Sequence, residues 1–596
     1  MTLDLKTCLA QSPLFNQLDA ASLDELHAAF EYRHLSRGET LFRRGEVGDA
    51  FYFLASGRLQ IIKDSVVGEL TPGDTFGELA LIGEQTRAAT IVAARDSELG
   101  RLPKQQFQQL LKNHQSIAIE LIKLLGEHLN QQQNGEESHS CTVVTLVTLS
   151  SHPSVKSLPP ALSRLLVSDK RTCHIDPEQL SHQLWSGADE MLANDSNSHN
   201  ERLSRWLSEQ EQDSDYILLQ TSDSPSVWRD FCLNQADKTL YLTDDSASSL
   251  ALPIRSDKAV ESELVLLHES STIRPVDTHK RLQQCKVKRH HHIRQGSESD
   301  IQRLARDIKG ESIAVVLGGG GARSFAHIGV LKAMEELNIP IDRIAGTSMG
   351  AILGAQYADG YSPDQMLLLN EEIWVRQKPH KDFTLPISSL LSANRAKQQT
   401  KGVFAERHIE DLWLDFFCVS TDLTELKPYH HRQGLVWSAL LASGAIPGVC
   451  SSIVSDEGSL LVDGGILDNL PVGAMREQHK GPVIAVDISS DKGLKPGVTD
   501  TIPPNGWQAL WHYLNPFNKK RRFPHIFKLI SHTATLTGTV NAQTSRQLAD
   551  LCLTPDCRGH GLMEMKRLDQ LVERGYQEAM PKLQQWLESR GQTKTS

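Results

Sequence analysis

The chain has 596 residues, of which 39% are hydrophobic and 23% charged, with a net charge of −11. This length exceeds what one hydrophobic core organises and predicts several domains, and the acidic balance excludes a general nucleic-acid binder. Nine scattered cysteines without a CxxC pair predict neither a disulfide framework nor a zinc site and fit a reducing compartment. No apolar run approaches the roughly 18 residues that span a bilayer, and no secretory leader is visible, so we expect a cytoplasmic protein.

Residues 1–135 predict a β-rich domain. Short strand-like runs at 40–42, 51–54, 59–62 and 90–93 alternate with turn glycines, among them Gly45, Gly57 and Gly73. The stretch from 73 to 99, GDTFGELALIGEQTRAATIVAARDSEL, resembles the phosphate-binding cassette of cyclic-nucleotide-binding domains. That resemblance implies a β-roll.

The cassette resemblance also implies a ligand site. Glu78 would accept from the ribose 2′-hydroxyl, and Arg87, a planar and permanently charged donor, would pair with the cyclic phosphate. Alanines after the arginine favour cyclic AMP over cyclic GMP. The alternative is a degenerate sensor fold kept for packing or dimerisation. The residues implied for the nucleotide site are Gly77, Glu78, Leu79, Ala80, Arg87 and Ala88.

Residues 141–300 predict an α/β connecting domain. Four apolar runs, VVTLVTL, DYILLQT, TLYLTD and ELVLLHE, are separated by helical or polar segments, a pattern typical of a parallel sheet. The basic segment at 286–294, KVKRHHHIR, predicts a solvated or interdomain strip. Consecutive histidines point in different directions, so we expect no metal site there.

Residues 313–489 begin with a strand-like run that turns into a helical pattern at four glycines, 318–321. Amides at a helix N-terminus are unpaired, and glycines let a ligand oxygen approach them closely. The turn therefore predicts an anion site. A tetrahedral oxyanion and a nucleotide phosphate both fit, although the Lys-Ser/Thr pair of a P-loop is missing.

Two further motifs add chemistry. Ser348 lies between Gly346 and Gly350 after a strand-like run, which predicts a nucleophile elbow, with a serine helix cap as the alternative. Asp463 ends an apolar run before two glycines, which predicts a carboxylate at a strand end, with a hairpin turn as the alternative. A nucleophile, a base and amides for an oxyanion together indicate a serine acyl hydrolase.

Glycine strip, elbow and DGG, in that order, resemble the patatin-like phospholipase family. The resemblance implies a three-layer α/β/α hydrolase fold, with Ser348 as nucleophile and Asp463 as its direct proton acceptor. It implies an oxyanion hole built from the amides of Gly319, Gly320 and Gly321. Ser324 departs from the family, which usually has glycine there. A Ser–Asp–His triad is the alternative, because several histidines follow Asp463 in the chain: His479, His512, His525, His532 and His560.

Residues 490–596 predict a mostly helical region that packs on the hydrolase domain, with an amphipathic stretch at 566–585. The segment 507–529 mixes aromatic residues with four consecutive cations. That combination suits peripheral contact with an anionic membrane at its inner face, and a partly buried helix with a basic loop is an equal alternative. The residues that would make the membrane contact are Trp507, Trp511, Lys519, Lys520, Arg521 and Arg522.

The order of the three domains, together with stretches such as RLSRWLSEQEQDSDYILLQTS, resembles the neuropathy target esterase family over nearly the whole chain. The resemblance implies a compact, bacterial-type member that hydrolyses phospholipid or lysophospholipid acyl esters. It implies no required cofactor, with cyclic AMP or cyclic GMP as an allosteric ligand. A homo-oligomer is compatible with the sequence. The competing hypothesis is a non-catalytic cyclic-nucleotide sensor or scaffold.

Overall fold

The computed structural model forms two compact units, one of residues 1–268 and 284–295 and the other of residues 269–283 and 296–596. The structure describes residues 5–12, 14–16, 18–63, 66–82, 86–114, 117–119, 121–123, 141–167, 170–176, 197–245, 252, 261–285, 287–385, 387, 389–489, 505–507, 511 and 536–593. No helix among these residues is both long and apolar enough to cross a bilayer.

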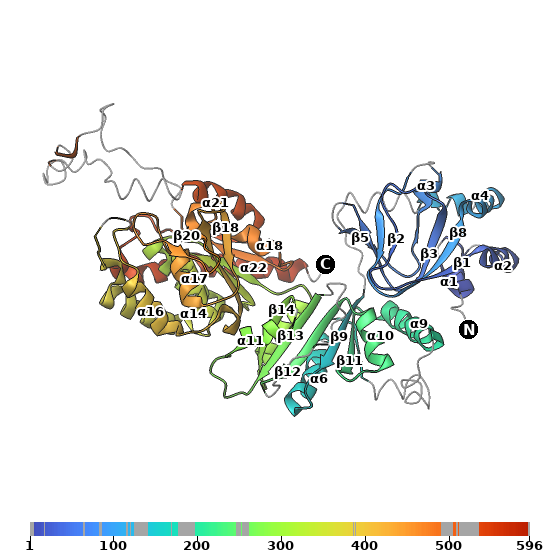
Figure 1. The fold of residues 1–596 in the computed structure, drawn as a ribbon, viewed down its shortest axis with the longest axis horizontal. Helices are drawn as coiled ribbons and strands as arrows, with labels where there is room; N and C mark the ends of the chain where they lie inside the picture. The colour runs from blue at the N-terminus through green and yellow to red at the C-terminus, as the bar shows by residue number, and fades with distance from the viewer. Residues whose placement is uncertain are drawn as a thin grey trace. The chain divides into compact units, whose positions relative to one another are not determined.

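The first unit begins with the predicted β-roll (Figure 1). Two four-stranded sheets, ordered β1-β8-β3-β6 and β2-β7-β4-β5, enclose an apolar core in which the rings of Tyr52 and Phe76 stack 5.4 Å apart. Gly45, Gly57 and Gly73 have φ of 88°, 92° and 98°, which explains the glycines at these turns. The elements are α1 (Leu5–Gln11), α2 (Ala20–Ala29), β1 (Glu31–Leu35), β2 (Thr40–Phe42), β3 (Ala50–Ser56), β4 (Leu59–Ile62), β5 (Val66–Leu70), β6 (Thr75–Phe76), α3 (Glu78–Ile82), β7 (Thr90–Ala93), β8 (Ser97–Pro103) and α4 (Lys104–Asn113).

The same unit contains a six-stranded parallel sheet, ordered β10-β11-β9-β12-β13-β14. The four predicted apolar runs form β9, β11, β12 and β13. Residues 289–294 of the histidine-rich segment form the edge strand β14, which pairs with β13 and has His292 and Ile293 buried, a difference from the predicted solvated or interdomain strip. The elements are β9 (Thr142–Thr148), α6 (Pro153–Val167), β10 (Thr172–Ile175), α9 (Asn197–Asp213), β11 (Tyr216–Ser222), α10 (Val227–Gln235), β12 (Lys238–Asp244), β13 (Glu261–His268) and β14 (Arg289–Arg294).

Buried ion pairs join the β-roll to this parallel sheet within the first unit. The Arg95 guanidinium is 1% exposed and pairs with Glu211 and Asp237. Asp237 also accepts from the Val143 amide of β9 at 2.8 Å and pairs with Arg58 at 3.1 Å. Removing one member would leave a buried charge unpaired, which is strongly destabilising.

The second unit is built on an eight-stranded mixed sheet. Its main order is β19-β20-β17-β16-β15-β21-β22, with β18 paired to β17. The segment from β17 through β16, β15 and β21 to β22 is parallel, and β18, β19 and β20 pair antiparallel. The strands are β15 (Ala314–Leu317), β16 (Arg343–Thr347), β17 (Asp415–Asp422), β18 (Lys427–His431), β19 (Ile453–Val454), β20 (Leu460–Asp463), β21 (Val483–Val486) and β22 (Leu551–Leu553).

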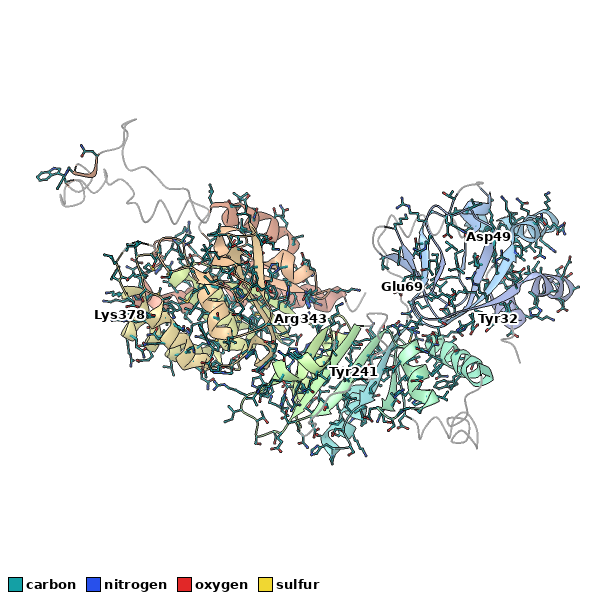
Figure 2. The ribbon with its side chains drawn as sticks, in the orientation of Figure 1. Tyr32, Asp49, Glu69, Tyr241, Arg343 and Lys378 are labelled. Atoms are coloured by element: carbon teal, nitrogen blue, oxygen red, sulfur yellow. The ribbon has the colours of Figure 1, made fainter. Side chains whose placement is uncertain are left out.

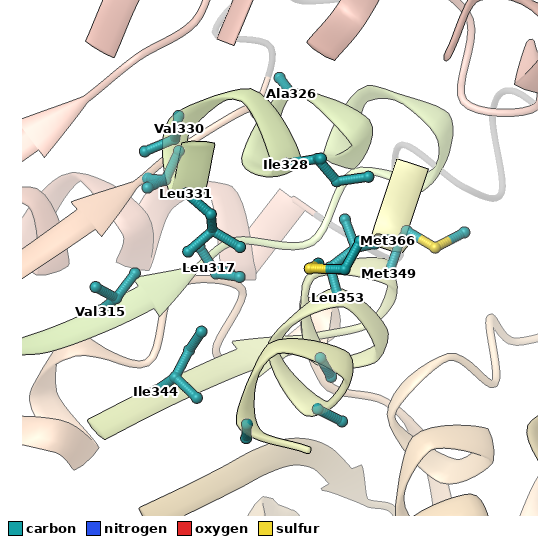
Figure 3. Packing of buried hydrophobic residues seen from close by; sticks show 14 of the residues in the cluster. Val315, Leu317, Ala326, Ile328, Val330, Leu331, Ile344, Met349, Leu353 and Met366 are labelled. Carbon is teal, nitrogen blue, oxygen red and sulfur yellow. The ribbon is translucent and has the colours of Figure 1, made fainter. Parts of the chain in front are cut away.

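Alternating side chains of this sheet build two cores, which confirms the three-layer fold. Val315, Leu317 and Ile344 pack on one face against helices α13, α14 and α22 (Figure 3). Val316 and Ala345 pack on the other face against α18 and α21. The helices are α11 (Thr278–Gln284), α12 (Glu298–Ile308), α13 (Ala326–Glu336), α14 (Met349–Ala358), α15 (Pro363–Asn370), α16 (Asn394–Phe404), α17 (Val436–Ser443), α18 (Val472–Arg476), α21 (Leu536–Leu548) and α22 (Leu568–Thr593).

The C-terminal helix α22 lies directly on α13, with glycines at the points of contact. A Cβ on Gly329 would lie 1.9 Å from the Val572 carbonyl oxygen, and one on Gly575 would lie 1.9 Å from the Ala326 carbonyl oxygen. The two backbones therefore meet without side chains between them. Because α13 follows the glycine strip directly, this contact also supports the candidate site. The predicted division of the chain at 135, 141, 300, 313 and 489/490 stays a prediction.

We expect Gly575→Ala to lower the free energy of unfolding by about 1 to 3 kcal/mol, because the added methyl group overpacks the α13–α22 contact. The matched control is Gly402→Ala in α16, where a Cβ meets open space. It should be neutral or stabilising by up to about 1 kcal/mol through helix propensity. Urea unfolding measures the free energy change of each variant, and hydrogen exchange of the α22 amides shows whether the change is local to that helix. Equal effects of the two variants would contradict overpacking of the α13–α22 contact.

Candidate active site

Ser348 occupies a strained turn between β16 and α14. Its φ is 56° and its ψ is −126°, a conformation that non-glycine residues rarely adopt. A Cβ at Gly346 would lie 2.6 Å from the Gly350 carbonyl carbon, and one at Gly350 would lie 2.5 Å from the Leu317 carbonyl oxygen. Neither position therefore admits a side chain. This is the geometry predicted for a nucleophile elbow.

The strand register of the sheet brings Asp463 to Ser348. Thr347, the last residue of β16, lies opposite Val419 of β17, and the next residue of β17, Ser420, lies opposite Asp463 of β20. The Ser348 hydroxyl donates to Asp463 Oδ2 at 2.8 Å. The two residues predicted to act together, 115 positions apart, are therefore in direct contact.

The Asp463 carboxyl group is buried, and burial raises its pKa to about 6. Two hydrogen bonds oppose this effect: the Gly465 amide donates to Oδ1 at 2.7 Å, and the Ser348 hydroxyl donates to Oδ2. The carboxylate is thus a stronger base than an exposed aspartate and is still ionised at neutral pH. Such a raised pKa suits proton transfer.

The glycine strip lies against the Ser348 side chain. A Cβ on Gly319 would be 3.2 Å from the Ser348 Cβ. Asn469 holds this glycine from both sides, because its carbonyl oxygen accepts from the Gly319 amide at 3.2 Å and its Nδ2 donates to the Gly319 carbonyl at 3.1 Å. The Gly319 amide is thus already engaged in this structure.

The next two amides of the strip differ from that of Gly319. Among the described residues, the structure records no backbone acceptor for the amides of Gly320 and Gly321. The following residue, Ala322, donates to the Leu562 carbonyl at 2.8 Å and anchors the strip from its other end. Ser324 lies in the 3-10 turn Gly321–Phe325, outside the positive-φ region, so the turn accepts a serine where the family usually has glycine.

Three supporting residues were not identified from the sequence as parts of the site. Ser443 accepts from the Ser348 amide at 2.9 Å and donates to the Val419 carbonyl at 2.6 Å. His327 donates through Nε2 to the Gly318 carbonyl at 2.8 Å, and burial lowers its pKa to about 4, so the ring is neutral. The third is Asn469, six residues after Asp463, which holds Gly319 from both sides.

An apolar cavity opens from Ser348. Helices α14, α16 and α17 each contribute to its wall, and Ser348 and Gly321 belong to its lining. Aliphatic, thioether and aromatic side chains dominate the lining, including Met349, Ile352, Val403, Phe404, Leu440 and Val449. The cavity suits a hydrocarbon chain whose carbonyl carbon lies at Ser348.

The structure records no histidine among the hydrogen-bond partners of the Asp463 side chain within the described residues; these are Ser348 and the Gly465 amide. Of the histidines proposed for a triad, His479 contacts the Pro482 carbonyl at 3.2 Å and His560 accepts from Arg323 through its carbonyl. The remaining candidates, His512, His525 and His532, lie outside the described residues.

The predicted nucleotide residues lie together in the β-roll. Arg87 donates to the Gly77 carbonyl at 3.0 Å, to the Ala50 carbonyl at 2.9 Å and to Asp49 at 3.1 Å, and its guanidinium lies 4.1 Å from the centre of the Phe42 ring. Glu78 and Ala80 are buried at the start of α3, whereas Leu79 and Ala88 are exposed. Arg87 is therefore held in place before any ligand binds.

The predicted membrane segment is described at only two of its named positions. The side chains of Trp507 and Trp511 are exposed. Lys519, Lys520, Arg521 and Arg522 lie outside the described residues. The membrane contact of this segment stays a prediction.

Comparison with known protein families matches three models along the chain. They are the cyclic nucleotide-binding domain at residues 32–114, the neuropathy target esterase family P-loop like domain at 143–316, and patatin-like phospholipase at 315–476. Human patatin-like phospholipase domain-containing protein 6 is 30% identical over 95% of this chain. The chain belongs to the neuropathy target esterase-like family.

Other family members match over a similar extent. Neuropathy target esterase sws of Drosophila melanogaster is 28% identical over 95% of this chain and 43% of that protein. Lysophospholipase nte1 of Aspergillus fumigatus is 27% identical over 92% of this chain and 41% of that protein. The chain covers 45% of the human relative and thus spans less than half the length of these proteins.

Among solved structures, the regulatory domain of Toxoplasma gondii PKA with cAMP is 35% identical to the matched part, with a TM-score of 0.18. The match covers 18% of this chain and 44% of that one.

The family model for the P-loop like domain covers β9, although the loop after β9, residues 149–152, has no glycine and no lysine.

We expect the reactivity of Ser348 towards a fluorophosphonate to fall as the pH drops through about 6. In the dyad hypothesis the hydroxyl is activated only by the carboxylate form of Asp463, and burial raises the pKa of that group to about 6. Labelling rates between pH 4.5 and 8.5, with the fold checked by circular dichroism at each pH, measure this. Asp463→Asn should label slowly without this inflection; an inflection retained in that variant would assign it to another group.

Proposed function

We propose that this family member is a serine esterase that hydrolyses lysophospholipid acyl esters through a Ser348–Asp463 dyad. The observation that carries the proposal is the 2.8 Å hydrogen bond from the Ser348 hydroxyl to the buried Asp463 carboxylate. The elbow, the glycine strip and the apolar cavity all meet at this bond. In this dyad Ser348 is the nucleophile and Asp463 accepts its proton directly, so the mechanism uses no histidine.

The reaction proceeds in two halves. Ser348 Oγ attacks the ester carbonyl carbon while its proton passes to Asp463 Oδ2, and the carbonyl oxygen becomes an oxyanion. The tetrahedral intermediate expels the glycerol oxygen, which takes the proton from Asp463, and an acyl-enzyme remains. Water then attacks the acyl-enzyme, Asp463 accepts the proton of that water, and collapse returns the proton to Ser348 as the fatty acid leaves.

We assign the oxyanion donors to the amides of Gly320 and Gly321, which have no recorded backbone acceptor among the described residues. For Gly319, donation to the oxyanion would require its amide to leave the Asn469 carbonyl. Each such donor typically lowers the barrier by about 2.7 to 4 kcal/mol. Neutral His327 and Asn469 hold the carbonyls of the strip, so that the amides stay directed at the reacting centre.

The substrate class follows from the cavity and the relatives. A largely apolar wall fits a fatty acyl chain, and its described lining residues include no lysine or arginine that would pair with a phosphorylated headgroup. One relative is named a lysophospholipase and others patatin-like phospholipases. A single acyl chain therefore enters the cavity, and the rest of the lipid stays outside.

Ser348→Ala and Asp463→Asn should each reduce hydrolysis of a lysophosphatidylcholine micelle by at least about a thousandfold, because each removes one half of the dyad. The matched control is Asp456→Asn, an exposed carboxylate in the turn between β19 and β20, which should retain full activity. Fatty-acid release is the readout. Full activity of the serine variant would exclude the esterase, and a folded chain that no fluorophosphonate labels would favour the scaffold hypothesis.

We propose further that the β-roll binds a cyclic nucleotide, with cyclic AMP preferred. Arg87 and the cassette backbone at Gly77 are already in contact, which supports a preformed phosphate site. Regulation would require that the ligand bind two states of the chain with different affinity, a coupling of about 1 to 3 kcal/mol. No cofactor is part of the proposed reaction.

Isothermal titration with cyclic AMP and cyclic GMP tests the nucleotide proposal. Glu78→Ala should weaken binding at least about tenfold, because a ribose hydroxyl loses its charged acceptor. Leu79→Ala is the control, since the Leu79 side chain is 56% exposed and the substitution keeps the backbone amide that would meet the phosphate. Absence of heat and of a thermal shift with either nucleotide would remove the proposed site.

A further inference from the structure

A short loop beside the cavity exposes three large apolar side chains. Phe383, Leu385 and Ile387 are 72%, 73% and 86% exposed. The loop joins a 3-10 turn at Pro379–Lys381 to helix α16. Apolar side chains concentrated at this exposure mark interaction surfaces in soluble proteins. We call residues 382–385, 387 and 389–391 the rim loop.

The rim loop is held in shape by its own backbone. Thr384 donates to the Leu390 carbonyl at 3.0 Å, Ser392 donates to the Asp382 carbonyl at 2.8 Å, and Phe383 and Leu391 form an antiparallel bridge. These bonds order the base of the loop. The exposed apolar side chains therefore belong to a loop whose base is ordered by backbone hydrogen bonds.

The cavity lining includes a residue next to the start of the rim loop and a residue at its end. His380 lies just before the loop and Leu391 at its end, and both line the cavity that reaches Ser348. The Leu391 amide donates to the Val449 carbonyl at 2.8 Å, which joins the loop to another lining segment. A surface that received the rim loop would thus lie next to the cavity.

The charge around the rim loop is opposite to that of the chain. Residues 371–401 contain six lysines and arginines but three acidic residues, within a chain of net charge −11. The acidic residues are paired, Asp382 with Arg395 and both Glu371 and Glu372 with Arg376. Figure 2 shows Lys378 at the edge of the second unit. Within the described part of the chain, the structure records no carboxylate partner for Lys378 or Lys381.

We propose that the rim loop, with Lys378 and Lys381, docks on the surface of an anionic phospholipid bilayer. Three apolar side chains reach the acyl boundary and the two lysines meet anionic headgroups, the combination that interfacial segments use. Docking places the cavity beside the lipid phase, so that an acyl chain passes from one apolar environment to another. The docking itself needs no catalysis; its effect on turnover rests on the proposed esterase function.

Vesicle co-sedimentation of the full-length Ser348→Ala chain tests docking without hydrolysis. The vesicles contain phosphatidylcholine with or without 30% phosphatidylglycerol, as about a third anionic lipid gives a clear surface potential. The triple variant Phe383→Ser, Leu385→Ser, Ile387→Ser should bind the anionic vesicles at least about tenfold more weakly, because it loses three buried apolar side chains.

The matched control replaces two equally exposed apolar residues, Ile273→Ser and Val276→Ser, which are 83% and 67% exposed. They adjoin Arg274, which pairs at 3.3 Å with Asp359 at the opposite end of α14 from Ser348. Vesicle binding of this variant should equal that of the parent. Equal losses in both variants would overturn the assignment of docking to the rim loop.

The two lysines supply a second, independent arm. Lys378→Gln and Lys381→Gln should each weaken binding to the anionic vesicles about fivefold and leave binding to pure phosphatidylcholine unchanged. Unchanged binding of both the lysine variants and the apolar triple variant would overturn the proposal. So would self-association of the parent chain that the triple variant abolishes without any vesicle binding, since the rim loop would then join two copies of the chain.

Turnover separates docking from chemistry. With Ser348 intact, the triple variant should hydrolyse a water-soluble short-chain ester at the parent rate but release fatty acid from vesicle-embedded lysophospholipid at least about tenfold more slowly. If the parent chain shows no activity on the soluble ester, the proposed esterase function is excluded and the vesicle-binding result still stands. Parallel loss of both activities in the triple variant would overturn the docking role.

Discussion

The hydrogen bond between Ser348 and Asp463 depends on two backbone constraints that must hold together. Ser348 must keep a positive φ, which is tolerable only because Gly346 and Gly350 leave space around the elbow. Asp463 must end a strand that pairs antiparallel with β17, since a slip of one residue would turn its side chain to the other face of the sheet. The three-layer fold supplies both constraints, because packed helices on each face hold the strands in register.

Around this bond the protein uses few polar groups, and each has a backbone partner. Ser443 secures the nucleophile amide, Asn469 secures Gly319, and neutral His327 secures Gly318. Burial that lowers the pKa of His327 also raises that of Asp463 to about 6, so the same dry environment keeps the imidazole uncharged and the carboxylate basic. The apolar cavity extends this environment away from the dyad.

In the second unit, the proposed reaction centre therefore lies in the lining of an apolar cavity. The glycine contacts of α13 and α22 support the helix that follows the glycine strip, although Gly329 and Gly575 are 246 positions apart. In the first unit, Arg87, which we propose as the cyclic-phosphate donor, likewise has contacts with Gly77, Ala50 and Asp49. Preorganisation lowers the cost of binding a charged ligand, because the donor is desolvated and oriented beforehand.

The sequence by itself determined the features that depend on local backbone geometry. Glycines flanking Ser348 and following Asp463, turn glycines of the β-roll and apolar runs of the parallel sheets were recognisable because each reflects φ, close approach or strand periodicity within a few residues. Tertiary structure alone decided that β14 is a strand, that Ser443 and His327 support the site, that the Gly319 amide is engaged, and that Phe383, Leu385 and Ile387 are exposed. These properties depend on burial and on partners distant in the chain, and neither is encoded in a local pattern.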